Sequence, residues 1–382
     1  MTIYQNLIIL FIATIIFGWG AHRFGMPIVV GQLLAGIIIG PSVFKLVSIS
    51  HELNSIAEIG VLLLMFIVGI ETDIKQLLSH IKTSLTVALL GALLPLGTFF
   101  LLAQIFHYNT VQSIFWGIVF SATSVSITAE VLSEYNQLKT KSGVTILGAA
   151  VGDDILAVLI LTGFMSSFGL KNQGTVGVPQ QLMIAILFFI LFWLFSRYIL
   201  PKIVQYLWQT KLPAIAGLIG VLLAITAGYF AEKAGVSAVV GAFFAGVALA
   251  RANQAKQIMA HTMTIGYGFF IPIFFASIGL KMTLTGLGDK WFLLIIMTIA
   301  AIVTKWAGSS LGAKITGMST YESHIIGLGM VSRGEMALII ADIGLSTHLI
   351  TNGDYSELAV VILASTLFAP IALRRSLLKS SK

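Results

Sequence analysis

Apolar segments long enough to cross a bilayer follow one another along almost the whole chain, with short polar connections between them. A helix that spans a membrane needs about 20 predominantly apolar residues. Hydrophobic residues make up 57% of the sequence and charged residues only 10%, whereas a soluble domain is about 25% charged. Backbone polar groups in lipid must be paired within the chain, so such segments fold as helices. The sequence therefore predicts an all-α polytopic membrane protein.

Hydropathy predicts thirteen transmembrane helices. Their approximate ranges are 4–21, 28–44, 56–72, 84–106, 112–133, 143–168, 181–200, 213–231, 236–250, 263–280, 291–313, 323–346 and 356–373. If the N-terminus is outside, the Lys and Arg residues between the spans divide fifteen to five in favour of the cytoplasmic side. Positively charged loops remain in the cytoplasm, so we expect an outer N-terminus and a cytoplasmic C-terminus. Membrane orientation explains these scattered basic residues better than nucleic-acid binding does.

An internal repeat appears at a constant offset of 210 residues. The matching positions of the first copy are Ile15, Gly18, Ala21, Gly25, Val29, Val30, Gly31, Ala35, Gly36, Gly69 and Gly117, each identical to the residue 210 positions later. Spans one to six therefore correspond to spans eight to thirteen, and the seventh is a linker. Corresponding spans are seven crossings apart. Because seven is an odd number, the two copies are expected to be inverted in the membrane. Inverted repeats with a site near the midplane are typical of secondary transporters.

Two adjacent carboxylates, Asp153 and Asp154, lie inside the apolar run from Val144 to Phe168. A charged side chain at the centre of a bilayer costs about 2.5–3.5 kcal/mol on insertion scales, and such residues usually mark ion or proton pathways. Two neighbouring carboxylates cost more, so one of them can remain protonated. The pair predicts an ion or proton site; the structural alternative is that the pair lies at the helix end among the lipid headgroups.

A lysine inside the eleventh span, Lys305, is the natural partner for this pair. A buried lysine either pairs with a carboxylate or loses its proton. Adjacent residues of a helix point about 100° apart, so one aspartate can face Lys305 while the other faces a cavity.

Two polar segments inside spans five and twelve are predicted to break their helices. The first runs from Ser121 to Thr128, and its repeat partner contains Ser332-Arg333-Gly334-Glu335. Hydroxyl groups can pair the carbonyls that a break releases, although the same groups also serve as ordinary packing contacts between membrane helices. Arg333 and Glu335 are expected to neutralise partners on other helices or the dipoles of broken ones. Glu130 follows the first segment and could line an inner vestibule.

These features together resemble bacterial sodium/proton antiporters of the monovalent cation:proton antiporter superfamily, in the NapA-like branch. The resemblance is carried by the thirteen spans, by Ala122-Thr123-Ser124, by Asp153-Asp154, by Lys305 and by Arg333-Gly334-Glu335. It implies that Asp153 pairs with Lys305, while Asp154 is the principal sodium ligand and Thr123 assists it. It also implies that spans five and twelve are unwound and cross each other.

The resemblance further implies a division into moving and static parts. A scaffold that dimerises would comprise residues 1–82 and 212–288, a core that transports the ion would comprise residues 83–170 and 289–382, and residues 171–211 would form the linker helix. Runs of small residues at Gly31 to Gly40 and Gly241 to Gly246 also favour close helix contacts in a homodimer.

The expected function is the exchange of cytoplasmic sodium or lithium for external protons by alternating access in a bacterial cell membrane, with a role in pH homeostasis. Counting charges favours two protons for each sodium ion. The chain is not expected to be an enzyme or to use a cofactor; its partners are sodium or lithium ions, protons, membrane lipid and a second copy of itself. The alternatives are a potassium/proton antiporter, a cation channel, and an intramembrane hydrolase that uses the aspartate pair.

Overall fold

The computed structural model describes residues 3–48, 50–168, 177–210, 214–281 and 291–379. These residues form helices and turns, and the part of the chain they cover contains no strand. Ten helical segments of the described residues are long and apolar enough to cross a membrane, counting 110–134 as one segment. The prediction of an all-helical membrane protein is thus confirmed. Three shorter apolar helices, at 28–39, 238–249 and 336–346, fall within the second, ninth and twelfth predicted spans.

The chain divides into two compact units. The first contains residues 1–49, 76–175 and 275–382, and the second contains residues 50–75 and 176–274. These limits differ from the predicted scaffold and core, because residues 1–49 group with the first unit. Compactness does not test a division based on motion, so the scaffold-and-core division stays a proposal.

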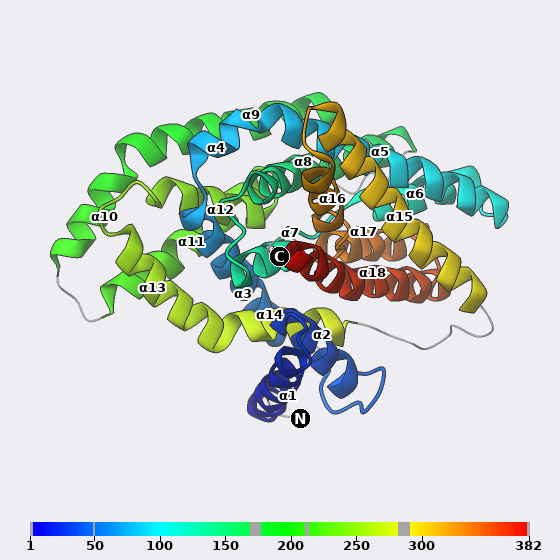
Figure 1. Cartoon of the computed structure of the whole chain (residues 1–382), viewed down its shortest axis with the longest axis horizontal. Helices are drawn as coiled ribbons and strands as arrows, with labels where there is room; N and C mark the ends of the chain where they lie inside the picture. The colour runs from blue at the N-terminus through cyan, green and yellow to red at the C-terminus, as the bar shows by residue number, and fades with distance from the viewer. Residues whose placement is uncertain (1–2, 49, 169–176, 211–213, 282–290, 380–382) are drawn as a thin grey trace. The chain divides into compact units, whose positions relative to one another are not determined.

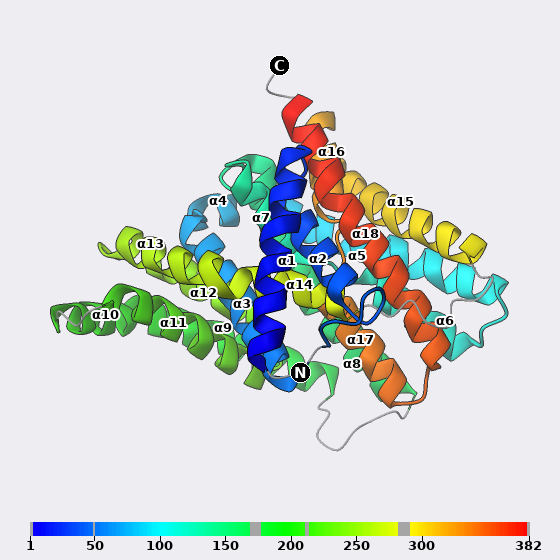
Figure 2. The ribbon, with the colours of Figure 1, turned by 90° about the horizontal axis from the view of Figure 1, so that it is seen from below.

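The first unit holds most of the helices. They are α1 (Ile3–Arg23), α2 (Ile28–Ile39), α5 (Ile81–Ile105), α6 (Thr110–Ser121), α7 (Val125–Glu134), α8 (Lys141–Ser167), α15 (Trp291–Ile315), α16 (Thr320–Gly329), α17 (Glu335–Ser346) and α18 (Asn352–Lys379), with α4 (Ile74–Ser79) and α14 (Ile271–Leu280) at its boundaries. Helix α1 packs along α2 (Figure 2), and α5 packs along α15 (Figure 1).

The second unit is built around α3 and α12. Its helices are α3 (His51–Glu71), α9 (Val178–Tyr198), α10 (Leu200–Gln209), α11 (Ile215–Lys233), α12 (Ala238–Leu249) and α13 (Ala255–Ile265), followed by the π-helix η1 (Gly266–Phe270). Helix α12 packs against α3 and α11. The seventh predicted span, 181–200, corresponds to α9, which ends at Tyr198, and the separate helix α10 follows it.

The helix limits themselves repeat with the 210-residue offset. Helix α2 corresponds residue for residue to α12, and α5 corresponds to α15. The turns that follow α1 and α11 contain Gly25 and Gly235, whose φ angles are 64° and 67°. Only glycine adopts such positive φ values without steric cost, so both turns use the same residue for the same reason.

Glycines let helices of the first unit cross at close range. A Cβ atom added to Gly36 of α2 would collide with the carbonyl oxygen of Ala276, and one added to Gly279 of α14 would collide with that of Leu33. Each glycine therefore faces the backbone of the other helix. In a membrane, where apolar burial gives no driving force between helices, this close approach supplies the packing energy.

The second unit contains the counterpart of this crossing. A Cβ atom added to Gly246 of α12 would collide with the carbonyl oxygen of Phe66, and one added to Gly69 of α3 would collide with that of Phe243. All four positions are related by 210 residues to those of the α2–α14 crossing. The sequence repeat is therefore also a repeat of helix contacts.

This contact predicts a stability difference between two glycine substitutions. We expect Gly246→Ala to lower the free energy of unfolding by about 1–3 kcal/mol, the usual cost of overpacking. Gly97→Ala in α5 is the control: its added Cβ meets nothing within 4 Å, and alanine favours a helix by up to about 1 kcal/mol. Thermal unfolding in mild detergent measures both. Equal midpoints for the two variants would contradict the crossing.

Candidate ion-binding site

The membrane segment 110–134 is broken at its centre. Helix α6 ends at Ser121, Ala122 and Ser124 are extended, and α7 begins at Val125. Serine and threonine side chains compete for backbone hydrogen bonds and favour such interruptions. All residues from Ser121 to Thr128 are buried, so the backbone groups that the break releases need partners within the protein.

A second break faces the first. Helix α16 ends at Gly329 and α17 begins at Glu335. The amide of Ser124 donates to the carbonyl of Ser332 at 2.8 Å, and the hydroxyl of Ser332 donates back to the carbonyl of Ser124 at 2.8 Å. A Cβ on Gly334 would lie 2.6 Å from the Ser124 hydroxyl. The two breaks therefore cross in direct contact, as the family resemblance implied for spans five and twelve.

Thr128 adds a third link across the breaks. Its hydroxyl donates to the carbonyl of Gly329 at 2.6 Å and lies 2.8 Å from the Ser332 hydroxyl. The sequence left open whether the Ser/Thr segment breaks the helix or packs helices together. In the structure it does both.

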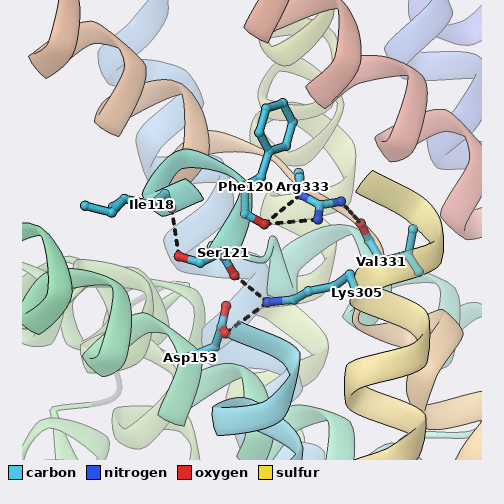
Figure 3. Close-up of polar contacts among 7 residues, drawn as sticks. All are labelled: Ile118, Phe120, Ser121, Asp153, Lys305, Val331 and Arg333. Carbon is cyan, nitrogen blue, oxygen red and sulfur yellow. Dashed lines mark hydrogen bonds and ion pairs between the residues drawn. The ribbon is translucent and has the colours of Figure 1, made fainter. Parts of the chain in front are cut away.

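Two cations meet the C-terminus of α6 (Figure 3). The guanidinium of Arg333 donates to the carbonyl of Phe120 through Nε at 3.3 Å and Nη2 at 3.0 Å, and to Val331 through Nη1 at 3.2 Å. The ammonium of Lys305 donates to the carbonyl of Ser121. A helix C-terminus carries about half a negative charge, so both cations stabilise this helix end by offsetting its charge.

Lys305 also forms the predicted ion pair. Its Nζ lies 3.0 Å from Oδ1 of Asp153, and the two side chains are 0% and 2% exposed. Helix α8 continues through Asp153 and Asp154 from Lys141 to Ser167, so the two aspartates lie in mid-helix rather than at a helix end. Glycines bring Lys305 to this place: a Cβ on Gly308 of α15 would collide with the carbonyl of Leu90 on α5.

Oxygen atoms near the break remain available to a ligand. The hydroxyl of Thr123 and Oδ2 of Asp153 are buried and have no hydrogen-bond partner among the described residues. Asp154, the next residue on α8, is also buried. Hard cations are held by carboxylate, carbonyl and hydroxyl oxygens, so this donor set suits a cation that has lost its water.

The remaining predicted residues are placed less directly. Glu130 lies on α7 and is half-buried, and Ser124 forms part of the crossing. Glu335 begins α17, but its side chain lies outside the described residues. The structure therefore brings Asp153, Lys305 and Arg333 to one break.

Sequence reasoning missed two buried residues of α18. The hydroxyl of Thr366 donates to the carbonyl of Arg333 and so pairs a backbone group of the second break. Glu357 is 0% exposed although it follows the start of the last predicted span by one residue. A carboxylate inside a predicted span was the available signal for Glu357, whereas a lone threonine gives none.

Comparison with known proteins shows the family of this chain. The family model for the transmembrane sodium/hydrogen exchanger matches residues 7–379. The chain belongs to this family. It is 39% identical over 370 residues to the Na(+)/H(+) antiporter of Enterococcus hirae, covering 96% of each chain. It is 35% identical to the Na(+)/H(+)-K(+) antiporter GerN of Bacillus cereus, covering 92% of this chain and 90% of GerN.

A solved structure agrees on the fold. The chain aligns with the sodium proton antiporter MjNhaP1 from Methanocaldococcus jannaschii with a TM-score of 0.68 and 17% identity, over 100% of this chain and 96% of that one. The family membership confirms the prediction of a multi-pass membrane antiporter that exchanges cations for protons. The prediction that the chain is a transporter rather than an enzyme is confirmed by the same finding.

The capping role of Arg333 is testable through stability. Arg333→Gln removes the charge and the forked contact with Phe120, and hydrogen bonds to charged groups are worth about 1.5–3 kcal/mol each. We expect the free energy of unfolding to fall by about 3 kcal/mol, with partial recovery in Arg333→Lys. Arg375→Gln, at an exposed position of the same chain, is the control. Unfolding midpoints that match for all three variants would show that Arg333 does not stabilise the break.

Proposed function

We propose that the protein exchanges cytoplasmic sodium or lithium for external protons by alternating access. The observation that carries the proposal is the buried Lys305–Asp153 pair, 3.0 Å across, beside Asp154 at the crossing of two broken helices. The name of the relative from Enterococcus hirae supports sodium as the cation.

Asp154 is the proposed principal ligand, assisted by Thr123 and by the second oxygen of Asp153. A monovalent cation needs a full negative charge to offset the loss of its water. A proton on Asp154 removes that charge, so sodium and protons compete for one group. The two aspartates and Lys305 then titrate as one coupled set.

The proposed topology has thirteen crossings, an outer N-terminus and inverted repeats. The shared helix limits of α5 and α15, and the matched glycine crossings α2–α14 and α3–α12, support the repeat. The excess of basic residues in alternate connections supports the orientation.

The proposed motion moves a core of residues 83–170 and 289–382 against a scaffold of residues 1–82 and 212–288, joined by the linker at 171–211. A homodimer of scaffolds is also proposed, on the family resemblance alone. The glycines first taken to favour dimer contacts, among them Gly31, Gly36, Gly241 and Gly246, have backbone of their own chain against them.

The proposed stoichiometry follows from charges. With a proton on Asp154, an ionised Asp153 and a protonated Lys305, the site sums to zero. When sodium enters, Asp154 ionises, Asp153 turns towards the cation, and the released Lys305 loses its proton in a desolvated place. Two carboxylates and one sodium ion then sum to minus one. Each cycle would move two protons one way and one sodium ion the other, and so one net charge.

Potassium is the second candidate cation, because the printed name of GerN includes K(+). Exchange measured in proteoliposomes by dye quenching, with sodium, lithium and potassium offered separately, distinguishes the two. Proton release on addition of potassium, with none on addition of sodium, would replace the first proposal by the second.

The role of Asp154 predicts a variant that folds but does not transport. Asp154→Asn keeps the shape of the side chain and removes the charge, so we expect exchange to be abolished while the protein elutes as wild type does. Asp73→Asn, an exposed carboxylate outside the break, should exchange normally. Substantial sodium/proton exchange in Asp154→Asn would contradict the assignment.

The role of Lys305 predicts a response to voltage. A potential of 100 mV contributes about 2.3 kcal/mol for each charge moved. At zero pH gradient, an imposed potential should therefore drive sodium flux through the wild-type protein, and Lys305→Gln should weaken or abolish this response. One-for-one exchange that is indifferent to potential would exclude Lys305 as the second proton carrier.

A further inference from the structure

The second unit contains a small cavity, and none of the residues of the proposed ion site lines it. It has a volume of about 180 Å³ and lies where α9 ends, α10 begins and α12 ends. Arg197 and Arg251 line it together with the apolar side chains of Leu200, Val204 and Leu249. Small-molecule pockets are usually about 300–1,000 Å³, so this one suits a headgroup better than a whole ligand.

The helices around the cavity place it at the membrane surface. Arg197 is the last residue but one of α9, and Trp193 and Tyr198 beside it are 56% and 57% exposed. Exposed Trp and Tyr residues gather at headgroup level. The chain then turns into α10 (Figure 1), which buries Leu200 and Val204 and exposes Lys202. Such a division of polar and apolar residues is typical of helices that lie in the plane of the interface.

The charge at the cavity calls for an anion. Arg197 and Arg251 are exposed and make no ion pair within the described part of the chain. Both guanidinium groups line the same cavity, so one anion bound there can attract both. A guanidinium binds phosphate oxygens in a forked, bidentate manner.

We propose that this cavity binds the phosphodiester headgroup of an anionic phospholipid. The two arginines hold the phosphate, and the buried side chains of Leu200, Val204 and Leu249 form the apolar lining of the cavity. Helix α9 supplies a surface for the acyl chains, because only 6% of its apolar membrane segment is buried and residues such as Ile190 and Leu194 are exposed. A soluble anion would find the phosphate contacts but would leave this apolar surface unused.

The test compares two pairs of substitutions that remove the same charge. Arg197→Gln with Arg251→Gln removes both cavity cations, whereas Lys202→Gln with Lys256→Gln removes two exposed cations that do not line the cavity. Wild type and both double variants are purified in mild detergent, delipidated, and titrated with phosphatidylglycerol, phosphatidylcholine or inorganic phosphate. Native mass spectrometry counts bound lipid, and thermal unfolding follows stabilisation by each ligand.

We expect phosphatidylglycerol to bind the wild-type protein and the lysine double variant alike. Binding to the arginine double variant should weaken about tenfold or more, since a lost charge-assisted hydrogen bond costs about this factor. Equal loss in the two double variants would overturn the proposal in favour of general surface charge. Phosphatidylcholine bound as tightly as phosphatidylglycerol would also overturn it.

Two further outcomes identify other occupants. Inorganic phosphate that displaces phosphatidylglycerol at similar concentrations would make this a site for free anions. Dimerisation without lipid that is lost only in the arginine double variant would make it a contact with a second copy. Sodium/proton exchange is not the readout, so failure of this proposal leaves the assignment of Asp154 untouched.

Discussion

A helix that stops inside a membrane leaves carbonyl and amide groups that lipid cannot pair, and the arrangement of the first unit depends on pairing them. Each unpaired group in hydrocarbon costs several kcal/mol. At the end of α6 the partners are cationic: Arg333 donates hydrogen bonds to the carbonyl of Phe120, and Lys305 donates one to that of Ser121. At the crossing itself the partners are the backbone and hydroxyl groups of Ser124, Ser332 and Thr128. The breaks are stable because each supplies partners for the other and Lys305 of α15 supplies one more.

This pairing also connects the break to charge. Lys305 uses one ammonium group for the Ser121 carbonyl and for Asp153. Any event that draws Asp153 away from Lys305 therefore also alters a contact that holds α6. The proposed arrival of a cation at Asp154 is such an event. The same lysine would thus report the charge state of α8 to the broken helix, without a separate mechanical element.

The sequence predicted the features that have a strong local signal. Apolar length marked the helices, and the cost of a carboxylate in lipid marked the two aspartates and their pairing with Lys305. The choice of Asp153 as the partner came from the family resemblance. It did not predict the separate helix α10 after Tyr198, because only the fold shows that Leu200 and Val204 turn inwards. Thr366 was missed because its role depends on a carbonyl 33 residues away in the chain. Glycines that repeat were recognised as a pattern, but the helix that each one faces is a property of the folded chain.

The repeat preserves packing and discards charge. Positions 210 residues apart give matched glycine crossings, yet Lys305 corresponds to Pro95, and Asp153 and Asp154 correspond to Leu363 and Ala364. Thr123, a proposed ligand in the first break, corresponds to Arg333 of the second break, whose side chain pairs the Phe120 carbonyl at the end of α6. Packing can be duplicated freely, because each close crossing is satisfied by its own two helices. A second carboxylate pair would need its own cations in a medium that penalises every unpaired charge. The proposed ion site therefore takes its carboxylates from one copy and both cations from the other.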